Sequence, residues 1–212
     1  MALRRCLRDP IAEIETAAAR LNDAVSAHLR GERDVAEELL HLADDKVVWE
    51  WLDSVWGKSS DYNRRRRIMQ DPPVLPPDQR ARPRQATAEI KRLVHERDGY
   101  YCRFCKIPVV RDEVRKAIKG QYPKAVPWEG TTATQHAAFQ CMWAQYDHMI
   151  PHARGGTSDL GNIYLTCAAC NYGRMQYVLE EQDLMHPSLH PPRQGAWDGL
   201  ERFRRNTPNC VV

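Results

Sequence analysis

The residues with the clearest chemical potential are two Cys-x-x-Cys pairs, Cys102 with Cys105 and Cys167 with Cys170. Two thiolates three residues apart on a tight turn can bind one ion, and two such pairs supply the four ligands of a tetrahedral zinc site. The 61 residues between the pairs exceed the spacing of a compact zinc ribbon, so the pairs enclose other structure. Because four thiolates leave no open coordination position, we expect a structural zinc ion.

Polar side chains that suit hydrolysis lie near the second pair. An imidazole such as His148 titrates at about pH 6.5, so it can take a proton from water. If residues 146–150 form a strand, Asp147 points to the opposite side. A carboxylate and an amide oxygen suit Mg²⁺ or Mn²⁺, and Asp147 and Asn171 are the available pair. His152 is compatible with a second ligand, a phosphate contact or a surface residue.

The pattern around these residues predicts a small strand–strand–helix unit. We expect a strand at 146–150, a Gly-Gly loop at 152–158, a returning strand at 162–166 and a helix at 168–179. A unit of this size buries little apolar surface. A structural zinc ion, which can contribute on the order of 10 kcal/mol to folding, would therefore be essential to it.

The helices that could position this unit are expected before it in the sequence. Apolar residues recur at helical spacing over 9–30 and 32–56, which predicts an antiparallel helical hairpin. The hairpin could support the chain, form a homodimer or bind a partner protein. A third helix is expected at 87–98, before the first cysteine pair.

A basic segment separates the hairpin from the cysteines. Residues 1–63 carry 8 basic and 13 acidic side chains, whereas residues 64–92 carry 9 and 3. Prolines within 72–77 favour an extended path. This arm could follow a polyanion such as DNA, or Arg64 to Arg67 could be a solvated helix end. The arginines expected to contact nucleic acid are Arg64, Arg65, Arg66, Arg67, Arg80, Arg82 and Arg84.

Bulk composition excludes several classes of protein. Hydrophobic residues make up 42% and charged residues 28%, as in ordinary globular proteins, and the net charge is +3. No apolar run is long enough for a membrane span, so we expect no membrane association. The first residues turn acidic where a signal peptide needs an apolar core, which favours the cytoplasm. In that reducing compartment, seven cysteines favour metal over disulfides.

The order of motifs resembles the HNH, or ββα-metal, endonucleases, in the subgroup with two Cys-x-x-Cys zinc knuckles. The family line has Asp-His, Pro, Gly-Gly, Asn, and a Cys-x-x-Cys followed by His or Asn. This chain has Asp147-His148, Pro151, Gly155-Gly156, Asn162 and Cys167-x-x-Cys170-Asn171. It departs from the minimal family pattern in the insertion before Asp147 and in having Asn171 in place of histidine.

The resemblance implies a role for each matched residue. His148 would be the general base, and Asn162 would brace the loop that orients it. Asp147 and Asn171 would hold a catalytic Mg²⁺ or Mn²⁺ ion, while Arg174 could contact phosphate. The implied fold is α+β, a zinc-stapled ββα-metal core with an N-terminal helical hairpin. The expected units are the hairpin (1–60), a basic Pro-rich linker (61–86), the nuclease domain (87–182) and a C-terminal tail (183–212).

The sequence is compatible with three functions. The leading one is a metal-dependent DNA endonuclease, a module used by phage, restriction, mobile-element and defence nucleases. The alternative is a non-catalytic zinc-containing module that binds nucleic acid, although binding alone does not require Asp147, His148, Asn162 and Asn171 together. In a third reading the helical hairpin is an adaptor for a partner protein, with the nuclease as effector.

Overall fold

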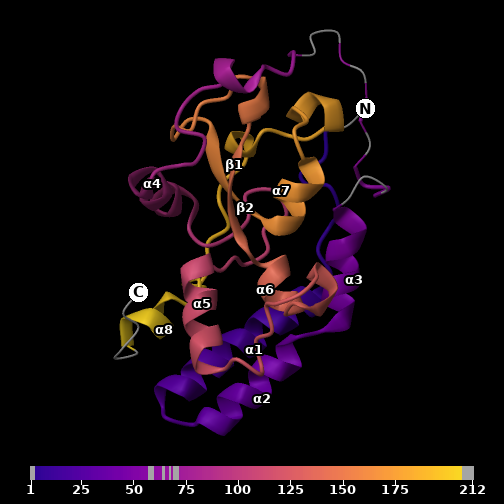
Figure 1. The fold of residues 1–212 in the computed structure, drawn as a ribbon. Helices are drawn as coiled ribbons and strands as arrows, with labels where there is room; N and C mark the ends of the chain where they lie inside the picture. The colour runs from indigo at the N-terminus through magenta and orange to yellow at the C-terminus, as the bar shows by residue number, and fades with distance from the viewer. Residues whose placement is uncertain (1–2, 57–59, 64, 67, 69–71, 207–212) are drawn as a thin grey trace.

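A two-stranded sheet with one short helix lies at one end of the molecule, and two N-terminal helices lie at the other (Figure 1). The structure is a computed structural model that describes residues 3–56, 60–63, 65–66, 68 and 72–206. The α-helices and strands are α1 (Ala12–Leu29), α2 (Arg33–Ala43), α3 (Lys46–Val55), α4 (Ala88–Asp98), α5 (Asp112–Gln121), α6 (Ala137–Cys141), β1 (Ala144–His148), β2 (Ile163–Cys167), α7 (Ala168–Arg174) and α8 (Glu201–Asn206). Short 3₁₀ turns are Pro77–Gln79, Thr132–Thr134, His152–Arg154, Leu179–Gln182 and Pro187–Leu189.

The predicted strand–strand–helix unit is confirmed. Strand β1 pairs antiparallel with β2, in a register that sets Asp147 opposite Tyr164. Helix α7 begins directly after β2, where the Cys167 side chain accepts a hydrogen bond from the Cys170 backbone N–H. The helix is shorter than the expected 168–179, because Met175 adopts a φ of 56°, which ends it.

Helix α4 is fixed to this unit by a buried carboxylate. Thr87 caps the helix through the Ile90 N–H, and Gly99 ends it at a φ of 69°. The last helical residue, Asp98, accepts hydrogen bonds from the Leu165 N–H of β2 at 3.0 Å and from Arg103 at 2.5 Å. Asp98 therefore joins the helix, the first cysteine turn and the sheet.

The N-terminal helices differ from the expected hairpin in one respect. Helices α1 and α2 form the hairpin around Gly31, whose φ is +84°. The single second helix expected over 32–56 is wrong, because it breaks at two aspartates. Asp45 caps α3 through the Val47 N–H at 2.9 Å, and Asp44 accepts from the Ala137 N–H at 2.6 Å.

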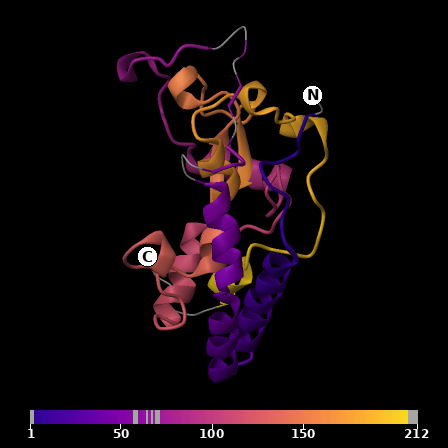
Figure 2. The ribbon, with the colours of Figure 1, turned by 90° about the vertical axis from the view of Figure 1, so that its right-hand side faces the viewer.

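Helix α3 extends from the α1–α2 pair towards the sheet unit and packs against α6 and α7 (Figure 2). A Cβ on Gly173 of α7 would lie 2.8 Å from the Val55 carbonyl oxygen, so the two helices touch here. Buried apolar residues form one continuous cluster from the N-terminal helices to the sheet unit. The boundaries 1–60, 61–86, 87–182 and 183–212 stay a prediction.

The basic Pro-rich segment lies against the loop that follows β1. The Leu75 N–H donates to the Ala153 carbonyl at 2.8 Å, and Arg154 donates to the Pro72 carbonyl at 2.6 Å. The part of the expected linker at 72–86 is thus packed onto the sheet unit along its length.

The C-terminal segment runs beside the N-terminal one in the same direction (Figure 2), with a parallel bridge between Arg4 and Leu184. It then reaches the first cysteine turn, where Trp197 donates to the Val109 carbonyl at 2.9 Å. Among the described residues, no helix is long and apolar enough to span a bilayer.

Candidate active site and metal centre

The four cysteines form one buried cluster. Their sulfur atoms all lie within 4.8 Å of one another, and the sulfurs of Cys105 and Cys167 are 3.6 Å apart. A disulfide would need about 2 Å, whereas zinc bound to sulfur at 2.3 Å in a tetrahedron sets sulfurs about 3.8 Å apart. The cluster therefore has the ligand type, number and spacing of a structural zinc site.

The backbone presets the geometry of both cysteine pairs. The first pair lies on a turn in which the Cys102 N–H donates to the Ile107 carbonyl and Lys106 adopts a φ of 67°. The second pair spans the β2–α7 junction. Burial, reinforced by Cys102 and Cys167, raises the pKa of the Cys105 thiol well above its ordinary value. A bound cation is what would allow all four sulfurs to ionise together.

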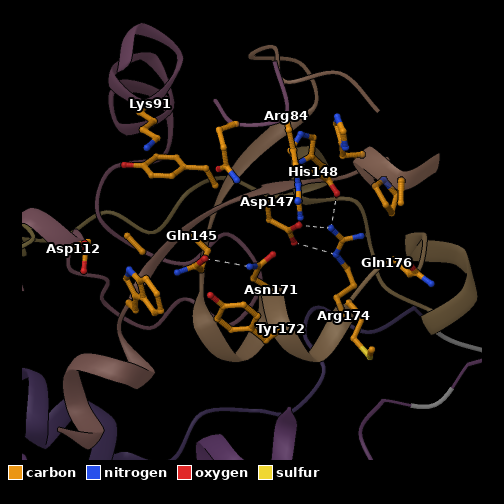
Figure 3. A pocket seen from close by; sticks show the side chains of 18 of the residues that line it. Arg84, Lys91, Asp112, Gln145, Asp147, His148, Asn171, Tyr172, Arg174 and Gln176 are labelled. Carbon is orange, nitrogen blue, oxygen red and sulfur yellow. Dashed lines mark hydrogen bonds and ion pairs between the residues drawn. The ribbon is translucent and has the colours of Figure 1, made fainter. Parts of the chain in front are cut away.

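A pocket of about 640 Å³ opens in front of β1 and α7 (Figure 3). Asp147 and His148 reach it from β1, and Asn171 reaches it from the first turn of α7. Because Asn171 follows Cys170, the cysteine cluster fixes the turn that carries it. The structure thus brings three of the predicted site residues to one cavity.

His148 is half-buried and held by a hydrogen-bond chain. Its Nε2 lies 2.9 Å from the Ser158 hydroxyl oxygen, which lies 3.1 Å from the Arg84 carbonyl oxygen. A carbonyl can only accept, so the Ser158 hydroxyl donates its single hydrogen to Arg84. Towards His148 the hydroxyl therefore accepts, which places the imidazole proton on Nε2 and leaves the lone pair on Nδ1.

The surroundings of His148 favour the neutral imidazole. Burial lowers its pKa to about 4, and His152, Arg174 and Arg84 act in the same direction. An imidazole that stays neutral at physiological pH retains a lone pair for a proton. His148 is therefore available as a base over a wider pH range than an ordinary histidine.

Asp147 is paired with Arg174. Its carboxylate oxygens accept from Arg174 Nε at 3.1 Å and Nη2 at 2.5 Å, and both side chains are buried (Figure 3). Burial raises the pKa of Asp147, while Arg174 opposes that rise. Arg174 also donates to the carbonyls of His148 and Tyr177. Its guanidinium holds β1 and the end of α7, and the phosphate contact implied by the resemblance stays a prediction.

Asn171 presents an amide oxygen to the pocket. Its Nδ2 donates to Gln145 Oε1 at 3.3 Å, and its Oδ1 has no hydrogen-bond partner in the described part of the chain. A carboxylate and amide oxygens are the hard ligands of Mg²⁺ and Mn²⁺, so this donor set fits such an ion. Arg174 already balances the carboxylate charge of Asp147. Asp147 and Asn171 would therefore offer a metal ion little net negative charge.

Asn162 braces the loop after β1 and does not line this pocket. Its Oδ1 accepts from the Ile150 N–H at 2.8 Å, and its Nδ2 donates to the carbonyls of Ile150 and Thr157. Gly156 is required there, because a Cβ would lie 1.8 Å from the Ile150 carbonyl oxygen. These contacts hold the loop after β1 in shape, and a role for Asn162 in orienting His148 stays a prediction.

The basic arm separates into two groups. Arg80 and Arg84 line the pocket, together with Lys91 of α4, and Arg82 lines an adjoining depression with His152. His152 donates from Nε2 to the Ala81 carbonyl at 2.7 Å, so it holds the arm in place. Arg65 and Arg66 instead form ion pairs with Glu181 and Asp183, and Arg64 and Arg67 lie outside the described residues.

Three residues of the site were not predicted from the sequence: Gln145 and Lys91, which line the pocket, and Ser158, which contacts His148. Gln145 precedes Asp147 by two residues on β1, so alternation of the strand could have placed it on the same face. Lys91 faces the pocket through the packing of α4. Ser158 carried no recognisable signal, because its role depends on where the arm and the loop meet.

Comparison with known proteins locates one family. Residues 136–174 match the model of a family described as HNH endonuclease. No curated protein and no solved structure matches the chain. The matched range contains β1, the braced loop, β2, the second cysteine pair and α7.

Metal removal tests the cysteine cluster. We expect about one tightly bound zinc ion per chain, and we expect Cys167→Ser to lose it together with the fold of the sheet unit. The lost contribution is on the order of 10 kcal/mol, comparable with the whole stability of a typical domain. Elemental analysis and circular dichroism give the readout, with Cys141→Ala as the control, since Cys141 is buried outside the cluster. Folded protein that contains no zinc would contradict this assignment.

Proposed function

We propose that this chain, which contains an HNH endonuclease domain, is a metal-dependent endonuclease that hydrolyses phosphodiester bonds in DNA. The observation that carries the proposal is the state of His148, an imidazole whose Nε2 is held by the Ser158 hydroxyl at 2.9 Å, at a pocket that also holds a carboxylate, amide oxygens and basic side chains. A nucleic-acid module without catalysis would not require a base in this state.

In this proposal His148 acts as the general base. Nδ1 takes a proton from the attacking water, and the Nε2–H bond to Ser158 keeps the ring in the required orientation. A positioned base of this kind contributes about 10²- to 10⁴-fold to the rate. The Asn162 brace supports this role because it fixes the loop whose Ser158 contacts the imidazole.

Asp147 and Asn171 would hold the catalytic Mg²⁺ or Mn²⁺ ion. When bound, such an ion would stabilise the charge on the phosphate and on the leaving 3′ oxygen. Arg174 balances the only carboxylate of this pair, so the substrate phosphate would supply much of the negative charge at the site. Metal affinity is therefore expected to rise when DNA is present.

The remaining parts have supporting roles in the proposal. The four cysteines bind a structural zinc ion, and the protein works in the cytoplasm as a nuclease unit over 87–182. Arg80, Arg82 and Arg84 contact the DNA backbone along one side of the pocket. A homodimer or a protein partner would use the N-terminal helices, where Val35 and Leu42 of α2 are about half exposed.

His148→Ala tests the catalytic assignment. We expect cleavage of supercoiled plasmid with Mg²⁺ or Mn²⁺ to fall about 10²- to 10⁴-fold, because only the proton acceptor is lost, while zinc content and DNA binding remain. His41→Ala, an exposed imidazole on α2, should cleave like the wild type. Wild-type rates from His148→Ala would exclude His148 as the base. A wild-type protein that binds DNA without cleaving it would favour the non-catalytic alternative.

Arg84→Gln tests the path of the DNA backbone. This substitution removes the charge but keeps the backbone carbonyl that orients Ser158. We expect weaker binding to DNA of any sequence, with the slope of log K against log salt reduced by about 1. Arg30→Gln, at the far end of α1, should leave the slope unchanged. An unaltered slope for Arg84→Gln would remove the arm from the DNA interface.

A further inference from the structure

Two aromatic side chains form part of the wall of the same pocket. Trp143 lies just before β1 and Tyr172 lies on α7, next to Asn171 (Figure 3). Their ring centroids are 6.3 Å apart, with a tilt of 52° between the planes. Tyr172 is 41% exposed, and Trp143 is half-buried.

Each ring is supported from behind by another aromatic residue. Trp128 packs edge-on against Trp143 at 5.9 Å, and Trp56 packs edge-on against Tyr172 at 5.7 Å. Arg115 lies over Trp128 at 3.8 Å and adds support. These contacts help to hold two rings that line the pocket, so the rings are preorganised as a surface for a flat ligand.

The rest of the pocket indicates which flat ligand it would be. Arg80, Arg84 and Lys91 line it with positive charge. The carboxylates of Asp112 and Glu113 line it too, but Asp112 is paired with Arg115 and Lys116, and Glu113 lies 4.0 Å from Arg111. A ligand that is both planar and anionic matches this combination, and a nucleotide of the DNA substrate has both properties.

We propose that Trp143 and Tyr172 stack an unpaired base of the DNA strand close to the bond that is cleaved. The inference rests on the proposed nuclease function and narrows its substrate to DNA with an unstacked nucleotide at the site. Bases in an intact duplex are covered by their neighbours, so their faces cannot reach a side wall. Aromatic side chains bind the exposed base of a single strand or of a flipped nucleotide instead.

The contacts of Tyr172 support a ligand role over a packing role. Within the described residues its hydroxyl makes no hydrogen bond, and the side chain is among the exposed large apolar residues. A tyrosine that only filled the core would be buried with its hydroxyl paired, as Tyr122 is with His28 at 2.7 Å.

Binding assays in a His148→Ala background test this proposal without cleavage. Fluorescence anisotropy would compare a labelled single strand, the same strand with abasic sites, the perfect duplex and a duplex with one unpaired base. Tyr172→Ala should weaken binding of the single strand or the unpaired-base duplex about 10-fold, and perfect-duplex binding only slightly. Tyr172→Phe keeps the ring and should bind normally, and Trp143→Leu provides a second truncation after its zinc content is checked.

The pattern of affinities shows whether the stacked base belongs to a single strand or is flipped out of a duplex. Preference for the single strand over both duplexes indicates a single-stranded substrate, and preference for the unpaired-base duplex over the perfect duplex indicates a flipped nucleotide. Equal affinity for all four DNAs, with Tyr172→Ala binding like its parent, would overturn the proposal. Plasmid cleavage by the His148-containing protein is scored separately, so loss of base stacking and loss of nuclease activity are distinguished.

Discussion

The fold depends on bringing four buried thiols within 4.8 Å of one another. One pair lies on a turn after α4 and the other at the β2–α7 junction, so a single centre joins segments that are more than 60 residues apart. A two-stranded sheet and a seven-residue helix cannot bury enough apolar surface to be stable alone. Asn171 directly follows Cys170. The cysteine cluster that stabilises the unit therefore also fixes the position of Asn171 at the pocket.

Electrostatics then separates the roles of adjacent residues on β1. Asp147 is buried against Arg174, which balances its charge, whereas burial, together with His152, Arg174 and Arg84, lowers the pKa of His148 and favours its neutral form. The Arg84 carbonyl and the Ser158 hydroxyl fix the position of the imidazole proton. The basic arm thus has two separable contributions: its backbone orients the proposed base, and its side chains give the pocket positive charge.

Local sequence signals predicted the sheet unit, the capped helix at 87–98 and the clustering of cysteines, because these depend on turns, caps and spacings within a few residues. They did not predict the break between α2 and α3, where Asp44 bonds to a residue 93 positions later. The ion pairs of Arg65 and Arg66 with Glu181 and Asp183 could not be predicted either, because the partners are far apart in the sequence. The resemblance implies a phosphate contact for Arg174, and the sequence does not reveal that its guanidinium is buried against Asp147.

The proposed role of His148 as general base requires a neutral imidazole with its proton on Nε2. Nitrogen-15 NMR of the imidazole measures both properties at once, because protonated and unprotonated ring nitrogens differ strongly in chemical shift. Between pH 8 and pH 5.5 we expect one neutral form, Nε2–H, since burial lowers the pKa to about 4. The Ser158→Ala variant should lose this tautomer preference. Titration near the ordinary value of about 6.5, or a proton on Nδ1, would contradict the account.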